Sequence, residues 1–444
     1  MRESVTVSPF SDPTHGPADD VTAAQPAAPS RSAAPAHPAD YYPARAVVDL
    51  GAIRSNVEAL AARASTAQVM AVVKADAYGH GLVPSALAAL EGGATWLGTA
   101  QVPEALQLRR AGVTGARILT WLYAPGAPLR AAVEADVDLS VASRWALDDV
   151  VTAAREAGRT ARVHLKIDTG LGRNGLVPAQ LPDVLATALA AEAEGLVRVV
   201  GVWSHLAFAD APDHPVVARQ AAVFADAVSA VEAAGARLEV RHLANSAATL
   251  TSPALHWDLV RPGIAVYGLT PVPQLGGPER FGLVPAMTFE AELATVKRVP
   301  AGSGVSYGHE YVVPHDTVLG VVPLGYADGI PRHASGTADR WGGPVQVGGR
   351  RLGVAGRVCM DQVVLDLGPG ATEVAGDRVV LWGDGRDGAP TAQDWADVAG
   401  TISYELVARL GARVPRTYVD SERREAGGGQ DATAATAPVT GGAR

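Results

Sequence analysis

The sequence predicts an α/β plus all-β fold, in which a (β/α)8 barrel of the TIM type is followed by a smaller domain of β-strands. From residue 68 onward, short runs rich in Val, Leu and Ile alternate with Ala-rich amphipathic stretches. Near residue 286 this alternation ends, and the apolar runs are then separated by Gly, Pro and Asp turns. The length of 444 residues suits two domains, because single hydrophobic cores rarely grow beyond roughly 250–300 residues.

Eight apolar runs define the barrel strands, and they lie at Val69–Val73, Trp96–Thr99, Ile118–Leu122, Leu139–Val141, Val163–Ile167, Val199–Trp203, Leu238–His242 and Leu259–Arg261. Helical patterns separate them, among others at Val83–Leu90, Glu104–Arg110, Trp145–Arg155 and Ala218–Ala233. Nearly continuous apolar strands with helices between them are typical of a parallel sheet that is covered by helices. Eight such units in about 200 residues favour a closed barrel over an open sheet.

The second part reads as strands with a short helical ending. Strands are predicted at Phe289–Val296, Val318–Leu324, Pro344–Val347, Arg351–Ala355, Val363–Leu367 and Val379–Leu381, and helices at Asp394–Ala399 and Ile402–Leu410. We therefore expect the barrel at 45–285 and a β-rich domain at 286–420. The Pro- and Ala-rich segment 1–44 and the Gly-rich segment 421–444 hold too few large apolar side chains to offset their ordering entropy, so both are expected to be disordered.

Composition and charge exclude several classes of protein. The formal net charge of −9 gives no electrostatic reason to expect nucleic acid or an anionic membrane as a partner. No run of 18 apolar residues is present, and the N-terminus lacks the basic and then apolar layout of a secretory signal. The single cysteine, Cys359, cannot form an intramolecular disulfide. A protein of the reducing cytoplasm is expected.

Lys74 lies at the position where enzymes with a barrel fold have their catalytic residues. Lys74 directly follows the first apolar run, and the C-terminal ends of barrel strands form the mouth in which active sites of this fold are built. Burial there disfavours the charged amine, and a neutral amine can form a Schiff base with a carbonyl. A lone lysine at a strand end is more often simply solvated, so its neighbours decide the interpretation.

The neighbouring residues 71–81, AVVKADAYGHG, resemble the cofactor-lysine motif of alanine racemases. Further matching strings follow in the order of that family, at Lys166–Arg173, Ser204–Ala207, Ala244–Ala247, Arg261–Ile264, Val305–Gly308, Gly325–Gly329 and Gly356–Gln362. The resemblance covers roughly residues 45–418. It implies interconversion of L- and D-alanine with pyridoxal 5'-phosphate, which supplies D-alanine for peptidoglycan. No metal is expected.

The resemblance also implies the residues that hold the cofactor. Lys74 binds pyridoxal phosphate covalently and acts as one catalytic base. The phosphate is bound by hydroxyl groups and by backbone amides, from Tyr78, Ser246, Gly263, Ile264 and Tyr404. Hydroxyls and free backbone N–H groups near helix starts suit a dianion.

A second base is required because racemisation removes a proton from one face of the α-carbon and returns one on the other. The resemblance assigns this role to Tyr307 of the partner subunit in a homodimer whose active sites are shared between chains. A tyrosine has a reference pKa of about 10 and needs help to act as a base. In the family pattern His205 supplies that help, hydrogen-bonded between Tyr307 and Arg261.

Arg261 discriminates most sharply among pyridoxal enzymes. Most of them place a carboxylate beside the pyridine nitrogen, which keeps that nitrogen protonated and draws carbanion charge into the ring. An arginine stays cationic, so the nitrogen facing it is expected to remain unprotonated. The ring is then a weaker electron sink, which favours return of a proton to the α-carbon over transamination.

Four further residues complete the site by resemblance. Arg173 contacts the phenolic oxygen of the cofactor and the carboxylate of the substrate. Lys166 matches a lysine that is carbamylated in many relatives, where the added carboxylate orients Arg173. Tyr326 and Met360 match partner-chain residues that narrow the entrance and contact the substrate.

Three alternatives stay open at this point. A barrel-type decarboxylase of basic amino acids shares the domain plan, and Cys359–Asp361 resembles its substrate element, but such enzymes place a glutamate where this chain has Arg261. A non-catalytic pyridoxal phosphate carrier would be a lone barrel without use for Tyr307. A serine racemase or one of broader specificity differs only in the geometry around Tyr326 and Met360.

Overall fold

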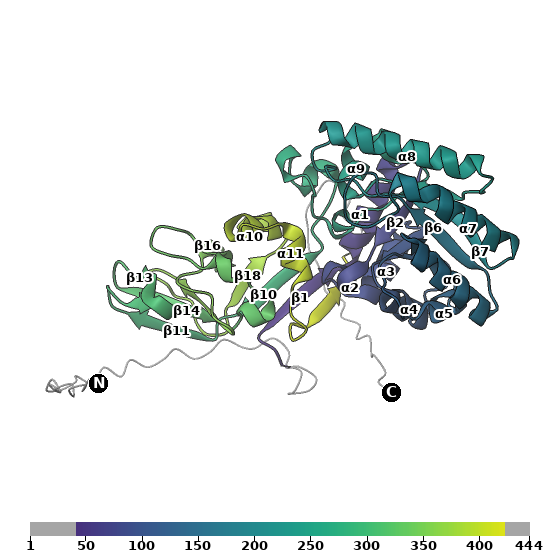
Figure 1. The fold of residues 1–444 in the computed structure, drawn as a ribbon. Coiled ribbons are helices and arrows are strands. Elements are labelled where there is room, and N and C mark those ends of the chain that lie inside the picture. The colour runs from purple at the N-terminus through teal and green to yellow at the C-terminus, as the bar shows by residue number, and fades with distance from the viewer. Residues whose placement is uncertain (1–40, 422–444) are drawn as a thin grey trace, which may run out of the picture.

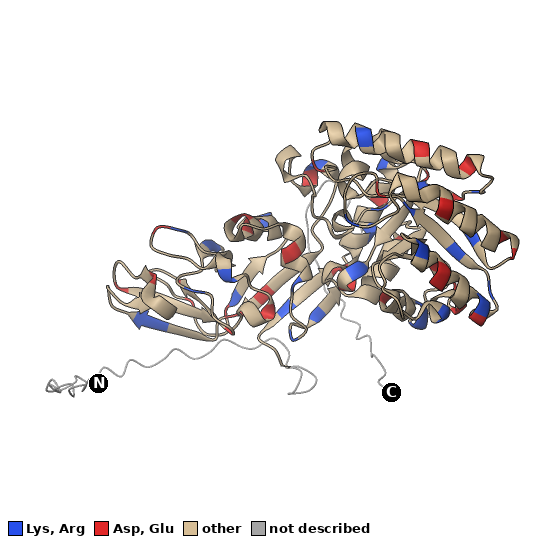
Figure 2. Cartoon of the chain, in the orientation of Figure 1, with Lys and Arg blue, Asp and Glu red and all other residues tan. Residues whose placement is uncertain are grey.

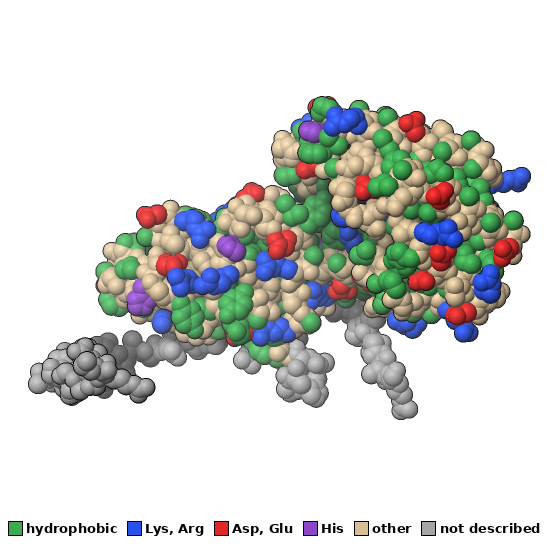
Figure 3. Space-filling view, viewed as in Figure 1, with side chains coloured by type: hydrophobic (Ala, Val, Ile, Leu, Met, Phe, Trp, Pro, Cys, Tyr) green, Lys and Arg blue, Asp and Glu red, His purple; other side chains and the backbone are tan. Residues whose placement is uncertain are grey.

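A computed structural model describes residues 41–421 of the chain. Its ribbon forms two lobes, a barrel wrapped by helices and a smaller lobe rich in strands (Figure 1). Charged residues of both signs are interspersed over both lobes (Figure 2), and on the face shown in Figure 3 they lie scattered among apolar side chains. Among the described residues, no helix is both long enough and apolar enough to cross a membrane.

The barrel is built from eight parallel strands in one sheet: β2 (Gln68–Val72), β3 (Trp96–Thr99), β4 (Arg117–Thr120), β5 (Asp138–Val141), β6 (Ala161–Lys166), β7 (Val197–Trp203), β8 (Val240–His242) and β9 (Leu259–Val260). The last strand, β9, pairs with the first, β2. Between β8 and β9 only the bridge Asn245–Arg261 joins the edges, so the barrel is nearly closed. The predicted barrel and its eight strands are confirmed.

Helices cover the outside of the barrel: α1 (Leu50–Arg63), α3 (Leu82–Glu91), α4 (Val102–Arg110), α5 (Leu129–Glu134), α6 (Arg144–Ala157), α7 (Leu181–Ala193), α8 (Pro215–Ala233) and α9 (Ser246–Thr251) (Figure 1). The sequence of α6 shows why they form. Ser143 caps its first turn by accepting a hydrogen bond from Ala146, and Gly158 ends it in the left-handed conformation. Its buried residues recur at helical spacing and face the sheet.

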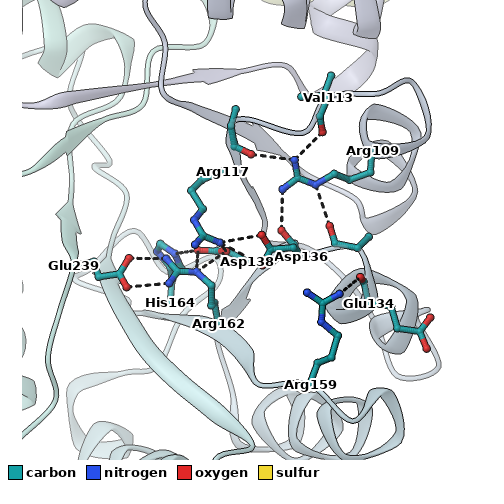
Figure 4. A network of polar contacts seen from close by, with 12 residues as sticks. Arg109, Val113, Arg117, Glu134, Asp136, Asp138, Arg159, Arg162, His164 and Glu239 are labelled. Carbon is teal, nitrogen blue, oxygen red and sulfur yellow. Dashed lines mark hydrogen bonds and ion pairs between the residues drawn. The ribbon is translucent and has the colours of Figure 1, made fainter.

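A polar network holds the floor of the barrel, where the strands begin (Figure 4). Asp138 is fully buried there, and its carboxylate accepts a hydrogen bond of 3.0 Å from Nε of Arg162. Arg162 also donates to Glu239 at 2.6 Å, while Arg117 lies 3.6 Å from Asp138. The partners compensate the desolvation of Asp138, since a buried carboxylate without them would be strongly destabilising.

The second lobe contains three sheets. The largest has the strand order β16 (Arg350–Gly353), β15 (Pro344–Val347), β18 (Arg378–Trp382), β10 (Met287–Glu292), β1 (Ala44–Asp49) and β19 (Arg416–Val419). The others are β11 (Thr295–Val299), β14 (Thr317–Val322) and β17 (Val363–Asp366), and the pair β12 (Gly304–Val305) and β13 (Tyr311–Val312). Two helices follow, α10 (Ala392–Ala399) and α11 (Ser403–Ala408).

The strands of the second lobe differ from the sequence prediction, which lacked β12, β13 and β19. The run predicted as one strand, Phe289–Val296, is divided between β10 and β11, which belong to different sheets. Residues 44–49 were grouped with the tail and the barrel, but as β1 they pair with β10 and β19 in the second lobe. The alternation of buried and exposed residues along β1 explains this pairing, because one face of the strand packs on the sheet.

The two predicted disordered tails lie mostly outside the described residues. Their described ends are bonded to the folded part of the chain. The hydroxyl of Tyr42 bonds to the carboxylate of Asp328, and the hydroxyl of Ser421 donates to Asp49 at 2.5 Å. These bonds therefore place Tyr42 and Ser421 in the folded part of the chain.

Candidate active site

The mouth of the barrel gathers the basic residues that the sequence singled out. Lys74 follows β2, Lys166 ends β6, His205 follows β7 and Arg261 follows β9. Because all eight strands are parallel, their C-terminal ends meet at one end of the barrel. The predicted residues of the barrel are therefore brought together.

Lys74 begins a turn with an unusual backbone. The segment α2 (Lys74–Tyr78) contains Ala75, Asp76 and Ala77 with φ between 52° and 55°, and Tyr78 follows with φ 54°. Left-handed backbone costs about 1–2 kcal/mol per non-glycine residue. Strain of this kind persists only where the surroundings enforce it, and it is concentrated at functional sites.

Hydrogen bonds around the turn enforce this conformation. Glu104 accepts a bond of 2.7 Å from the backbone N–H of Ala75, and Asp76 accepts one of 2.7 Å from the N–H of Leu82. The buried His80 places Nδ1 3.0 Å from the carbonyl oxygens of both Ala77 and Tyr78. The turn directs the amine of Lys74 toward Tyr78, with Nζ 5.9 Å from the centre of the ring.

The environment of Lys74 favours its neutral form. Burial lowers the pKa of the amine, and the positive charge of Arg173 lowers it further, while Glu104 opposes them. Arg173 itself is exposed. The ring of Trp121 lies 5.9 Å from Nζ. A neutral amine is the form that attacks a carbonyl, so this lysine is suited to a covalent bond with an aldehyde.

Lys166 is the most strongly perturbed lysine at the mouth. It is buried, and Nζ lies 4.3 Å from the ring centre of Trp203. Burial lowers the pKa of Lys166 to about 7, with further contributions from the charges of Arg173, Arg261 and Lys74. The lowered pKa makes the neutral amine far more accessible near neutral pH than in an exposed lysine.

Arg261 is buried among neutral groups. Its guanidinium donates to the carbonyl oxygens of Ser204 at 2.7 Å and Leu243 at 3.1 Å, and to Nδ1 of His242 at 3.3 Å. No ion pair of Arg261 with an acid is found within residues 41–421. Burial lowers its pKa to about 9, so the guanidinium keeps its charge at neutral pH.

His205 lies within the field of this cationic group. Burial lowers its pKa well below the usual value, and the charges of Arg261 and Arg173 lower it further, so the imidazole is neutral. Its backbone oxygen accepts a bond of 3.1 Å from Gln220. The hydrogen bond predicted between His205 and Arg261 is not found among residues 41–421 of the single chain, where Arg261 donates to His242 instead. Sequence reasoning had passed over His242.

The residues predicted to bind phosphate form a cradle beside the turn. Ser246 Oγ accepts bonds from the backbone N–H of Gly263 at 2.8 Å and of Ala265 at 3.4 Å. A Cβ at Gly263 would lie 2.2 Å from Oη of Tyr78, so only glycine fits there. Ile264 begins the adjoining 3-10 turn.

The second lobe contributes to this cradle. Tyr404, in α11, lies with its ring centre 6.2 Å from that of Tyr78. Burial raises the pKa of both hydroxyls, so both remain protonated donors. A group of hydroxyls and amides around a position without a side chain fits a bound phosphate.

Three predicted residues lie on the second lobe and are exposed in the single chain: Tyr307 (71%), Met360 (54%) and Tyr326 (41%). Backbone bonds tie the last two together, because Tyr326 donates to Cys359 at 3.0 Å and Ala327 donates to Met360 at 3.0 Å. Ser306, which precedes Tyr307, lies 3.3 Å from the sulfur of Cys359. The three side chains thus belong to one exposed region.

Known proteins resemble the chain throughout its described part. The family model for the N-terminal domain of alanine racemase matches residues 48–271, and the model for the C-terminal domain matches 286–418. Alanine racemase from Beutenbergia cavernae is 62% identical over 391 residues, which are 88% of this chain and 100% of the relative. The enzyme from Streptomyces coelicolor is 57% identical over 85% of this chain and 96% of its own.

Solved structures give the same result. The crystal structure of alanine racemase from Streptomyces lavendulae, which produces D-cycloserine, superposes with a TM-score of 0.83 at 56% identity, covering 85% of this chain and 97% of that one. Alanine racemase from Clostridium difficile 630 superposes with a TM-score of 0.78 at 29% identity over 86% of this chain and 96% of its own. The chain therefore belongs to the alanine racemase family.

Proposed function

We propose that the protein interconverts L-alanine and D-alanine with pyridoxal 5'-phosphate as its cofactor. The observation that carries the proposal is the buried Arg261 at the barrel mouth, which is hydrogen-bonded to neutral groups. It supports racemisation over decarboxylation, because an arginine in this place leaves the pyridine nitrogen without a proton. The names of the relatives support the same substrate.

The residues present fit the cofactor. Lys74 would hold its aldehyde carbon, since the pKa of this amine is lowered. Tyr78, Ser246, Tyr404 and the amides of Gly263 and Ile264 would hold its phosphate, with Arg261 facing its ring nitrogen. When bound, pyridoxal phosphate withdraws electrons from the α-carbon of the amino acid and so acidifies the α-proton.

Proton transfer is then assigned to two side chains of the protein. Nζ of Lys74 takes or returns the proton at one face of the α-carbon, and Oη of Tyr307 of the partner subunit serves the other face. The neutral His205 is proposed to accept a hydrogen bond from that tyrosine and help to deprotonate it. The exposure of Tyr307 in the single chain leaves it available for such a role in a homodimer.

The substrate is proposed to be oriented by charge and shape. Arg173 would bind its carboxylate, while Met360 and Tyr326 of the partner subunit would narrow the entrance. With its pKa near 7, Lys166 can add to carbon dioxide through its neutral amine, forming an N–C bond and losing a proton. The resulting carbamate would orient Arg173.

The wider setting is proposed on the same basis. A cytoplasmic homodimer would supply D-alanine for peptidoglycan. As a proposal we keep two domains, a barrel and a β-rich domain at 286–420, but strand β1 is removed from the barrel range 45–285 and added to the second domain.

The test uses the purified full-length protein. It is incubated with a panel of L-amino acids that includes alanine, serine, lysine and ornithine, and the products are separated by chiral chromatography. D-Alanine is expected to form fastest, without release of carbon dioxide. Borohydride reduction followed by peptide mapping should place the pyridoxyl mass on the peptide that contains Lys74. Labelling of Lys166 or Lys297, or amine formation from lysine, would contradict the proposal.

A further inference from the structure

A chain of hydrogen bonds crosses the interior of the barrel and ends at Arg261. From the mouth, Arg261 donates to Nδ1 of His242 at 3.3 Å. Nε2 of His242 lies 2.9 Å from Nδ1 of His164, and Nε2 of His164 lies 3.1 Å from Oδ2 of Asp138. Asp138 belongs to the network at the barrel floor (Figure 4). Four buried side chains thus connect the two ends of the barrel.

The two end groups of this hydrogen-bond chain, Arg261 and Asp138, determine which nitrogen of each histidine ring carries the proton. A guanidinium can only donate, so Nδ1 of His242 carries no proton, and the single proton of this neutral ring is on Nε2. That proton is donated to Nδ1 of His164, so the proton of His164 is on its own Nε2. Asp138, which can only accept when ionised, receives it. All donors therefore point from the mouth toward the floor.

Packing prevents the two rings from turning. A Cβ at Gly201, which is paired with His164 across the sheet, would lie 2.3 Å from Nδ1 of His164. The ring of His242 stacks on Trp203, with centres 5.5 Å apart and planes within 3°. Trp96 meets His164 edge to face at 5.6 Å. These contacts hold both imidazole rings in fixed orientations between the strands.

Burial explains why such a chain is needed. Asp138, His164 and His242 are each 0% exposed and Arg261 is 4% exposed. A buried guanidinium is unfavourable without compensation, yet a carboxylate in direct contact would cancel its positive field at the mouth. The hydrogen-bond chain instead ends on the carboxylate of Asp138, two imidazoles away, which is itself paired with Arg162. Each polarised ring then strengthens the next hydrogen bond.

We propose that Asp138, His164 and His242 are positioning residues that orient the guanidinium of Arg261 and link its charge to the carboxylate at the barrel floor. Their effect on the reaction rests on the proposed function, since it acts through Arg261. Their protonation pattern does not depend on that function.

The first test reads the protons directly. Holoenzyme labelled with ring 15N-histidine is studied by NMR, with the two signals assigned by their loss in His164→Gln and His242→Asn. Both rings of the unmodified protein are expected as neutral Nε2–H tautomers. A proton on Nδ1 of either ring, or a doubly protonated ring, would overturn the proposal. This result is independent of any racemase activity.

The second test removes the negative charge of Asp138, at the floor end of the hydrogen-bond chain. Asp138→Asn is compared with Glu239→Gln, which makes the same carboxylate-to-amide change at another partner of Arg162. Only Asp138→Asn is expected to shift the Nε2–H resonance of His242, which Asp138 does not touch. It should also lower kcat for alanine about tenfold, less than the loss expected from removing a group that acts directly on the developing charge, with KM changed less than about twofold.

The remaining outcomes are also decisive. If both substitutions changed the His242 resonance and kcat equally, the hydrogen-bond chain would have only a structural role in the floor network. That result would overturn the proposal. If Asp138→Asn does not fold, Gly201→Ala offers a second variant, because its methyl group would displace the His164 ring. Its His242 resonance should shift and its kcat should fall; an unchanged resonance and kcat would overturn the proposal.

Discussion

Single residues at the barrel mouth could be predicted because their sequence strings are distinctive. Lys74, Lys166, His205 and Arg261 were found from the motif order, and the structure brings them to one end of the barrel. His242 was missed, because an isolated histidine at the end of an apolar strand carries no signal of its own. Its role depends on His164, which is 78 residues away in sequence.

Replacement of Arg261 tests the most discriminating residue. Arg261→Glu would let the ring nitrogen of the cofactor hold a proton, so carbanion charge would spread into the ring. Racemisation should fall about a hundredfold, the scale of removing one preorganised electrostatic contact. Release of pyridoxamine phosphate should rise relative to racemisation. Chiral analysis of alanine and quantification of pyridoxamine phosphate measure both.

The control for this prediction is Arg144→Glu, a charge reversal at an exposed pair with Asp148. Such pairs contribute at most about 1 kcal/mol, so its chemistry should be unchanged. Arg261→Gln removes the charge without burying a carboxylate, and it should also lose racemisation if the glutamate variant is unstable. Full activity in both Arg261 variants would mean that the residue does not face the cofactor.

At the scale of elements, period and composition predicted the strands and helices of the barrel well, because each strand is buried on both faces and each helix on one. The turn at 75–78 could not be predicted in the same way. Its left-handed backbone is enforced by Glu104, Asp76 and His80 through tertiary contacts. The pairing of β1 with β10 was also missed, since pairing across about 240 residues leaves no local pattern.

The close approach of this turn to the second lobe can be tested at Gly79. A Cβ there would lie 2.1 Å from the backbone oxygen of Val407 in α11, at φ 81°. Gly79→Ala should therefore cost backbone strain of about 1 kcal/mol and, in addition, about 1–3 kcal/mol for the overpacked contact. Urea unfolding measures the loss, and the affinity for pyridoxal phosphate should fall with it.

The matched control is Gly112→Ala. Gly112 also has positive φ, 89°, but a Cβ there meets no atom within 4 Å. This variant should lose only the stability that the backbone strain costs, and its affinity for pyridoxal phosphate should be unchanged. Equal stability of the two variants would show that the turn and α11 can move apart without cost.

At the scale of the whole molecule, the described ends of the chain revise the expected folded core. A truncated chain spanning residues 41–421 keeps β1 and the bonds of Tyr42 and Ser421. Its kcat for alanine should stay within about twofold of the full chain, because it retains every contact that the structure describes. A chain spanning 45–420 should be less stable in urea. Loss of activity in the chain spanning 41–421 would show that the removed terminal segments contribute to the active site or to the dimer.

The exposed region with Tyr307, Tyr326 and Met360 decides whether one chain can complete the reaction. If it faces the barrel mouth of a partner subunit, Lys74→Ala and Tyr307→Ala chains are each inactive alone, but mixed dimers hold one intact site. Mixing the two variants should restore up to about a quarter of the activity, since random exchange makes half of the dimers mixed and each has one site of two. Native mass spectrometry of variants with distinct masses verifies the exchange. Racemase assays that stay at the level of the separate variants after complete exchange would place both bases on the same chain, and the exposed region would then need another explanation.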